Sequence, residues 1–412
     1  MRPSDAGWRP LYAVWELTLR CDLLCRHCGS RAGRARPEEL TTEEALDLVR
    51  QLAELGCREV TLIGGEAYLH EGWVRIGRAI RDAGMSLSMV TGGRGMTLER
   101  AAQAKEAGVM GVGVSVDALE PLHDALRGVR GAFRAAIDAI ACLRAAGVEV
   151  SANTQITRAA VTQIEPLMDL LMDAGIDAWQ VSLTVPMGRA ADEPGLILEP
   201  YQVLEVMPML ARIEARARAR KVDVFPGNDI GYFGPYEEQL RGRSMLGHRV
   251  ECTAGRLTLG IEADGSIKGC PSLPSRDYVG GNVRDHALKD IWERAAALRF
   301  TRERSAADLW GYCRDCYYAE ECLGGCSWTA HVLFGRIGNN PFCHHRALQL
   351  LREGKRERLV QKTRPEGLPF DHGTFDVVVE DWAPEELAQA RRVAETGQGW
   401  LLETSGAIDP SR

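Results

Sequence analysis

The chain of 412 residues contains no apolar run long enough to span a bilayer, and residues 1–10 lack the apolar core of a signal peptide. We therefore expect a cytoplasmic protein with no membrane partner. An excess of basic residues is also missing, because the formal net charge is −7. This argues against a nucleic acid as partner, since nucleic-acid-binding proteins usually present a basic surface.

Cysteine, by contrast, is plentiful. The chain has 12 cysteines but no secretion signal, and disulfides are rare in the reducing compartments where such a protein would reside. Metal binding is the better explanation for them.

The first half of the chain alternates between strand-like and helix-like runs, which is typical of βα units around a parallel sheet. A helix is expected at 42–55, begun by a Thr-Thr-Glu-Glu cap and ended by Gly56. Six units are too few for a closed eight-stranded barrel, so we predict an α/β fold with a partial (β/α)6 barrel of TIM type and functional groups at the carboxyl ends of the strands. The six expected strands are 11–19, 60–63, 87–90, 113–116, 148–151 and 179–183.

Three cysteines follow the first expected strand, in the run Cys21-Asp22-Leu23-Leu24-Cys25-Arg26-His27-Cys28. Iron–sulfur clusters normally take four thiolates, so three would leave one iron open. A structural zinc site is the alternative. Zinc sites usually pair two C-x2-C halves, and only His27 lies nearby as a fourth ligand.

The spacing C-x3-C-x2-C at the end of a first strand resembles the signature of radical S-adenosylmethionine (SAM) enzymes. That resemblance implies a [4Fe–4S] cluster on Cys21, Cys25 and Cys28 whose open iron binds SAM. After the second strand, Gly64-Gly65-Glu66 resembles the family's GGE motif, which contacts the SAM amino group; Ala67 stands where the family commonly has Pro.

Further SAM contacts are implied near the fourth strand. Ser115 and Asp117, followed by Arg127-Gly128, resemble the family's S-x-D and R-G stretch. Ser115 is the better candidate, because Asp117 and Arg127 could equally form an internal ion pair. Thr91-Gly92-Gly93, after the third strand, stays without an assigned role, and no catalytic side chain is assigned beyond the cluster-bound SAM.

The spacing of seven cysteines in the second half resembles that of the SPASM domain, which occurs in radical SAM maturases. Asp264-Gly265 predicts a hairpin between 257–261 and 266–268, which brings the first two together. In such domains two auxiliary [4Fe–4S] clusters are bound, which makes three clusters in all. The seven are Cys252, Cys270, Cys313, Cys316, Cys322, Cys326 and Cys343.

By position, the resemblance assigns one auxiliary cluster to Cys313, Cys316, Cys322 and Cys343. The other receives only Cys252, Cys270 and Cys326, so it has an open iron or a ligand other than cysteine. Cys57 and Cys142 fall in expected barrel helices and are interpreted as buried hydrophobes.

Residues 344–412 form the last segment of the chain. A basic helix near 352–358, a strand at 375–379 and a helix at 384–395 are expected there. The strand could offer an edge to a peptide, or could simply pack on the SPASM domain. We predict an N-terminal extension at 1–10, the radical SAM barrel at 11–225, a connector at 226–251, the SPASM domain with its hairpin and helices at 252–345, and a C-terminal extension of unknown role at 346–412.

The resemblance implies an oxidoreductase-type enzyme that cleaves SAM reductively to a 5′-deoxyadenosyl radical. Such enzymes typically modify a precursor peptide by cross-linking, decarboxylation, epimerisation or oxidation, and the segment 25–41 looks locally nearest to mycofactocin maturases. Pro271 weakens the interpretation as a sulfatase maturase, because those enzymes have an acidic residue at that position.

Expected partners are the peptide, an electron donor such as flavodoxin or ferredoxin, and a separate peptide-recognition protein if the C-terminal extension does not bind the peptide. A radical SAM enzyme acting on a small molecule or in cofactor biosynthesis is the second hypothesis, and a non-catalytic metal-binding scaffold the third.

Overall fold

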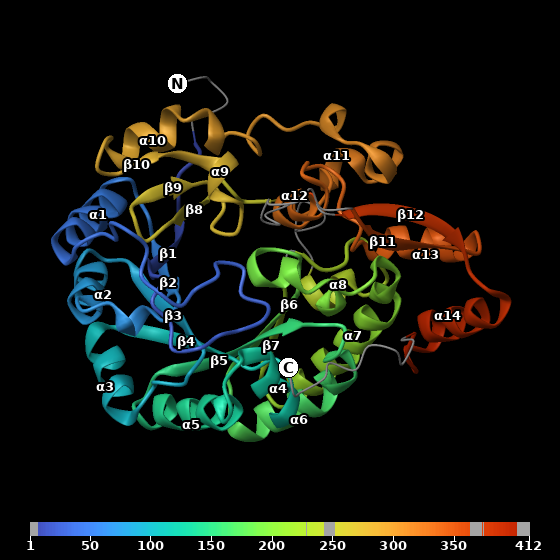
Figure 1. Ribbon diagram of the computed structural model, residues 1–412, viewed down its shortest axis with the longest axis horizontal. Helices are drawn as coiled ribbons and strands as arrows, with labels where there is room; N and C mark the ends of the chain where they lie inside the picture. The colour runs from blue at the N-terminus through green and yellow to red at the C-terminus, as the bar shows by residue number, and fades with distance from the viewer. Residues whose placement is uncertain (1–6, 228, 243–251, 363–372, 374, 402–412) are drawn as a thin grey trace. The chain divides into compact units, whose positions relative to one another are not determined.

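The computed structural model describes residues 7–227, 229–242, 252–362, 373 and 375–401. The chain forms two compact units, whose helices and strands are labelled in Figure 1. The first consists of residues 1–116, 127–152 and 253–304, and the second of residues 117–126, 153–252 and 305–412. Each unit thus combines segments that are distant in the sequence.

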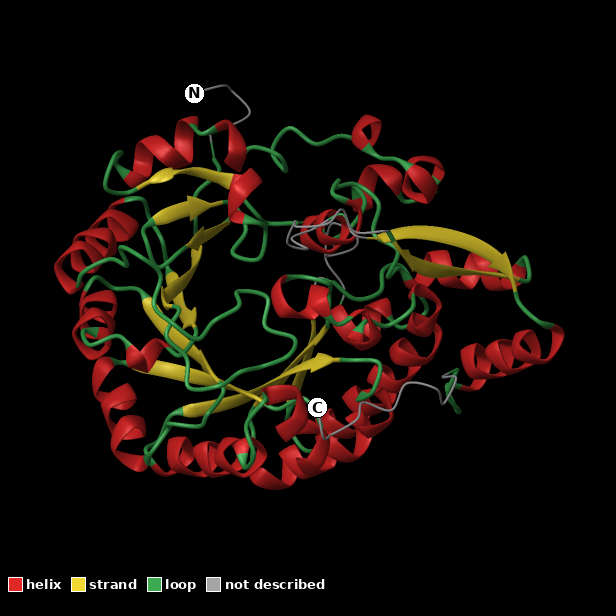
Figure 2. Cartoon of the chain, in the orientation of Figure 1, coloured by secondary structure: helices red, strands yellow, loops and turns green. Residues whose placement is uncertain are grey.

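The first unit is built on a parallel sheet, with helices on its outer side (Figure 2). Its strands follow the order β10-β9-β8-β1-β2-β3-β4, in which β8 lies parallel to β1, and β9 and β10 continue antiparallel. The strands are β1 (Tyr12–Thr18), β2 (Glu59–Gly64), β3 (Ser86–Thr91), β4 (Val109–Ser115), β8 (Thr258–Ile261), β9 (Ser266–Lys268) and β10 (Val279–Asn282). The helices are α1 (Thr42–Glu54), α2 (Trp73–Asp82), α3 (Leu98–Ala107), α5 (Ala132–Ala145), α9 (Ser275–Tyr278) and α10 (Leu288–Arg294).

Local chemistry explains why these elements start where they do. Helix α1 begins with a capping box, in which the Thr41 hydroxyl accepts from the Glu44 N–H and the Glu44 carboxylate accepts from the Thr41 N–H. Its inner face is apolar, with Leu48 and Leu52 fully buried. Strand β1 is buried along almost its whole length, as expected for a parallel strand covered on both faces.

The second unit contains a parallel strand pair, several helices and a two-stranded antiparallel sheet. Strand β5 (Glu149–Ile156) belongs to both units, because the division falls after Ala152, and α4 (Glu120–Arg127) likewise ends in the first unit. The remaining strands are β6 (Ala178–Leu183), β7 (Asp223–Pro226), β11 (Lys355–Gln361) and β12 (Phe375–Asp381). The remaining helices are α6 (Ile164–Ala174), α7 (Val203–Ala219), α8 (Glu237–Arg241), α11 (Ala319–Cys322), α12 (Ser327–Phe334), α13 (His344–Arg352) and α14 (Pro384–Thr396).

The predicted α/β fold, its six strands and the small antiparallel hairpin are confirmed. The helix predicted at 352–358 is wrong. Helix α13 ends at Arg352, Gly354 adopts a left-handed conformation with φ +73°, and residues 355–361 form strand β11 instead. The predicted connector contains α8, while its residues 228 and 243–251 lie outside the described part, as do residues 1–6 of the predicted N-terminal extension.

Within the described residues, no helix combines the length and the apolar character that crossing a membrane requires.

Candidate functional site

The cysteine triad lies in the loop that leaves the carboxyl end of β1. Cys25 is buried together with Leu23 and Ala132, and Cys21 and Cys28 pack against this group. Each sulfur accepts a hydrogen bond: Cys21 from the Leu23 N–H at 3.4 Å, Cys28 from the Ala32 N–H at 3.3 Å, and Cys25 from Nη1 of Arg127 at 3.7 Å. Three sulfurs that each face a donor suit thiolates, because such donors stabilise the negative charge.

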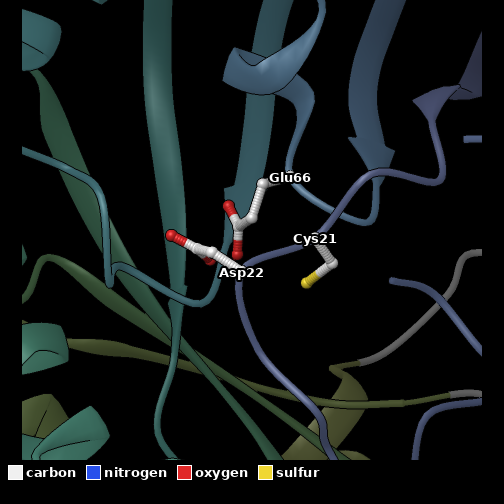
Figure 3. Close-up of side chains that lie close together, drawn as sticks. All are labelled: Cys21, Asp22 and Glu66. Carbon is white, nitrogen blue, oxygen red and sulfur yellow. The ribbon is translucent and has the colours of Figure 1, made fainter. Parts of the chain in front are cut away.

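The spacing of the sulfurs bears on zinc as the alternative. Sulfurs on one zinc ion lie about 3.8 Å apart, given zinc–sulfur bonds of about 2.3 Å in a tetrahedron. Among the described residues, a group of three or more ligand atoms within 4.8 Å of one another occurs only as Cys21, Asp22 and Glu66 (Figure 3), and not as the triad. The triad therefore fits a larger cluster better than one ion.

Burial raises the pKa of Cys21 to about 12. A thiol in that state releases its proton to solvent only when a strong positive charge stabilises the thiolate, and coordination to iron would supply that charge. The donor set and its burial thus fit the iron–sulfur cluster that the sequence predicts.

The two glycines after β2 are required by a close backbone approach. A Cβ on Gly64 would lie 2.2 Å from the carbonyl oxygen of Thr18, and one on Gly65 would lie 2.1 Å from that of Arg20. Gly64 also has a φ of +144°. Because neither glycine has a side chain, the backbone can pass close to the end of β1. The Glu66 N–H then donates to the Arg20 carbonyl at 2.8 Å.

The carboxyl of Glu66 is 1% exposed and is fixed by the next strand. Its Oε2 accepts from the Thr91 hydroxyl at 2.6 Å, and its Oε1 accepts from the Gly92 N–H at 2.6 Å. Burial outweighs these bonds and raises the pKa of Glu66 to about 7. A cationic amine beside this carboxyl would therefore find a fixed acceptor that ionises readily. Thr91 and Gly92 are the positioning residues whose role the sequence left open.

The three remaining predicted SAM contacts lie in different settings. Ser115 is the last residue of β4 and is partly exposed. Arg127 is buried and directs Nη1 to the sulfur of Cys25. Asp117 belongs to the second unit, where its Oδ1 accepts from the Gln155 N–H at 3.0 Å and its own N–H donates to Nδ1 of His123.

The four cysteines Cys313, Cys316, Cys322 and Cys343 line one cavity of about 350 Å³ in the second unit, part of it open to solvent. Tyr232 and Phe233 form its buried wall, and Tyr318 stacks on Phe233 with ring centroids 4.1 Å apart. Burial raises the pKa of Cys322 to about 12 and also raises those of Cys313 and Cys343. Four sulfurs around one cavity with aromatic walls fit a fully thiolate-ligated cluster.

The remaining predicted ligands are divided between the units. Cys252 and Cys326 lie in the second, where the Ser327 hydroxyl donates to the sulfur of Cys252 at 3.5 Å. Burial, and then Cys252, raises the pKa of Cys326 to about 12. Cys270 lies in the first unit, after β9, so its grouping with the other two stays a prediction.

Two cysteines were predicted to bind no metal. Cys57 is buried, and its thiol donates to the carbonyl oxygens of Glu59 and Leu11 at 3.3 and 3.7 Å, as in a thiol that packs as a hydrophobe. It follows α1 rather than lying within it, whereas Cys142 lies in α5 as predicted but is only partly buried. All 12 cysteines belong to the described part, and none of them forms a disulfide.

One acid in the second unit has no counterpart in the sequence prediction. Asp229 is fully buried after β7, and its Oδ2 accepts from the Leu183 N–H at 2.7 Å. Its Oδ1 has no hydrogen-bond partner among the described residues. Burial raises the pKa of Asp229 to about 7, so it can take up or release a proton near neutral pH. Its signal in the sequence is weak, because an acid after Gly-Asn reads as a turn residue.

Comparison with known families decides the identity of this arrangement. The description "Radical SAM superfamily" applies to residues 15–157, and "Iron-sulfur cluster-binding domain", the SPASM family, to residues 252–317. The chain is an enzyme that contains a radical SAM domain and a SPASM domain.

Relatives of this radical SAM/SPASM enzyme belong to more than one branch. An AdoMet-dependent heme synthase of Oleidesulfovibrio alaskensis is 29% identical over 353 residues, which are 80% of this chain and 86% of the relative. Among solved structures, anSMEcpe with bound AdoMet has a TM-score of 0.65 at 16% identity, covering 82% of this chain and 95% of its own. Streptococcus suis SuiB, bound to the precursor peptide SuiA, has a TM-score of 0.60 at 19% identity, covering 78% and 72%. At such low identity, the two structures show that the fold is shared.

Proposed function

We propose that this radical SAM/SPASM enzyme oxidatively modifies a residue of a ribosomally synthesised precursor peptide. One observation supports the SAM site above all: the chain has both a triad of hydrogen-bonded sulfurs and the fixed, buried carboxyl of Glu66. The sulfurs are ligands for a cluster, and the carboxyl is an acceptor for the SAM amine. When bound, the reduced cluster and SAM supply a 5′-deoxyadenosyl radical that removes a hydrogen atom from an unactivated carbon.

The side chains around the triad bind and orient. Glu66 accepts the SAM ammonium, held in place by Thr91 and Gly92. Ser115, at the carboxyl end of β4, is the candidate for a polar contact to SAM. Arg127 supports the cluster through Cys25 rather than SAM directly. Asp117, whose carboxylate accepts from strand β5, has the weakest claim to a ligand contact.

The cavity of the second unit suits an electron carrier. Four cysteines would complete a [4Fe–4S] cluster with no open iron, so it can accept or pass an electron but cannot bind substrate. With the cluster assigned to Cys252, Cys270 and Cys326, the chain would hold three clusters. A flavodoxin or ferredoxin is the proposed electron source.

The peptide substrate is supported by the shared fold with SuiB and anSMEcpe, both of which have also been solved with peptides bound. A surface for a peptide is available on β12, where Val378 and Val379 are 40% and 54% exposed. A separate recognition protein is the alternative to that strand. The second candidate function is a step in the synthesis of a haem-type cofactor, which the 29% identity to a heme synthase over four fifths of the chain favours.

One experiment separates these functions. The anaerobically reconstituted enzyme is reduced and given SAM with either a candidate precursor peptide, encoded in a short reading frame beside the gene, or a haem precursor. Formation of 5′-deoxyadenosine coupled to a mass change, or to deuterium uptake from solvent, in the peptide supports the proposal. Turnover of the haem precursor alone favours the second candidate. Absence of 5′-deoxyadenosine with every substrate, matching a Cys28→Ala control, would refute both.

A further inference from the structure

A charged residue lies buried directly beside the four-cysteine cavity. Arg346, on α13, is 1% exposed and three residues beyond Cys343. Its guanidinium lies 5.0 Å from the ring centre of Tyr312, and its Nη1 donates to Oδ1 of Asn339 at 2.7 Å and to the carbonyl oxygen of Asn340 at 3.4 Å. Tyr312 and Asn340 both line the cavity, so the cation contacts its wall.

The counter-charge comes from the C-terminal extension. Nη2 of Arg346 donates to Oε1 of Glu357, which lies on β11 and is 4% exposed. A buried ion pair gains little stability, because removing both charges from water costs about as much as their attraction returns. Its presence beside a metal-binding cavity calls for another reason.

The orientation of Arg346 supplies that reason. Its Nε–H is buried and has no hydrogen-bond partner among the described residues, an uncommon and costly state for a charged donor. The guanidinium contacts Tyr312 and Asn340, which line the cavity, whereas only its Nη2 is turned to Glu357. The cation therefore reaches the cavity wall directly.

We propose that Arg346, held by Glu357, is a positioning residue that stabilises the reduced form of the cluster bound by Cys313, Cys316, Cys322 and Cys343. Reduction adds one electron and thus one negative charge to the cluster, and a fixed cation beside its ligands favours that state. Net charge and hydrogen bonds to sulfur are the means by which proteins set such potentials. The C-terminal extension then contributes to electron transfer through β11. This rests on the proposed function, because it requires a cluster at this site.

The test is a redox titration followed by electron paramagnetic resonance. The parent is the full-length protein in which Cys21, Cys25, Cys28 and Cys252 are changed to alanine. In this parent, the observed signal comes from the four-cysteine cluster. Glu357→Gln should shift its midpoint potential to more positive values, because the cation loses its counter-charge. The pair Arg346→Gln with Glu357→Gln should shift it to more negative values than the parent. Glu380→Gln is the matched control: Glu380 pairs with Arg356 at 2.7 Å in the same hairpin and is a partly exposed carboxylate. It should leave the potential unchanged.

Equal potentials in the parent, the Glu357→Gln variant and the paired variant, at equal iron content, would overturn the inference while leaving the proposed function intact. If both variants keep native circular dichroism but lose the cluster, the ion pair is structural and the inference also fails. A parent protein that holds no cluster here would refute the proposed function instead.

Discussion

The hydroxyl of Thr91 donates to Oε2 of Glu66 over 2.6 Å, so the end of β3 fixes the carboxyl that follows β2. The Gly92 N–H completes this arrangement through the other oxygen. A carboxyl held from both sides is oriented before any ligand arrives, which spares the cost of ordering it on binding.

Replacing Thr91 by Val should weaken SAM binding by about tenfold, because a hydrogen bond to a charged group contributes about 1.5–3 kcal/mol. The dissociation constant of SAM for the reconstituted protein is the measurement. Thr61→Val is the control, since the Thr61 hydroxyl bonds Ser88 on the neighbouring strand. Equal losses in both variants would mean that Thr91 has no specific role.

Gly65→Ala should destabilise the protein by more than about 2 kcal/mol or abolish SAM binding, because the new methyl would meet the Arg20 carbonyl oxygen at 2.1 Å and something must shift. Gly33→Ala, in the same region of the first unit, meets no atom within 4 Å and should be tolerated. Thermal unfolding under anaerobic conditions checks both. A Gly65→Ala variant as stable and as tight for SAM as Gly33→Ala would contradict the geometry.

Cys343→Ala should lower the iron content by about four of about twelve atoms per chain, if each of three clusters holds four irons. SAM cleavage should continue, because the triad is intact, while product formation from the substrate is lost. Cys142→Ala, in α5, should retain all the iron. Iron and sulfide analysis, with 5′-deoxyadenosine measured alongside, separates the two sites. Loss of SAM cleavage in Cys343→Ala would argue against separate roles.

Stability should fall as pH rises because of Glu205, which lies on α7. It is 2% exposed, and burial raises its pKa to about 7 from a reference of 4.5, despite bonds from Gln202 and Leu401. The folded state therefore binds the proton more tightly than the unfolded state. The contribution is complete below pH about 4.5 and is lost as pH rises through about 7.

Glu205→Gln should remove that dependence and raise the free energy of unfolding at pH 8 by on the order of 2 kcal/mol relative to wild type. Urea unfolding at pH 5.5 and pH 8 is the measurement, and the exposed Glu395→Gln on α14 is the control. An unchanged difference between the two pH values in Glu205→Gln would show that this carboxyl does not titrate as inferred.

Much of the site could be predicted because its chemistry demands particular residue types at fixed spacing. The triad, Gly64 to Glu66 and the later cysteines are of this kind. Residues that act through tertiary contact gave no such signal. No pattern in the sequence predicts that Thr91 contacts Glu66. In the sequence, Arg346 and Glu357 look like ordinary surface charges, although both are buried.

Two features of the fold escaped prediction for related reasons. Residues 355–361 contain Lys, Arg and Glu, which favour helices, yet pairing with β12 makes them a strand. The parallel pairing of β8 with β1 joins residues 246 positions apart, such as Tyr12 and Thr258, and no local pattern encodes a partner at that distance.

That pairing has a consequence for how the protein is made. Until residues 258–261 have left the ribosome, one edge of β1 has no partner, and an unpaired apolar edge is a template for aggregation. Contacts this distant in sequence also slow folding. A chain cut before β8 should therefore be insoluble rather than a free-standing barrel, and expression of the full length should depend on chaperones that shield β1 during synthesis.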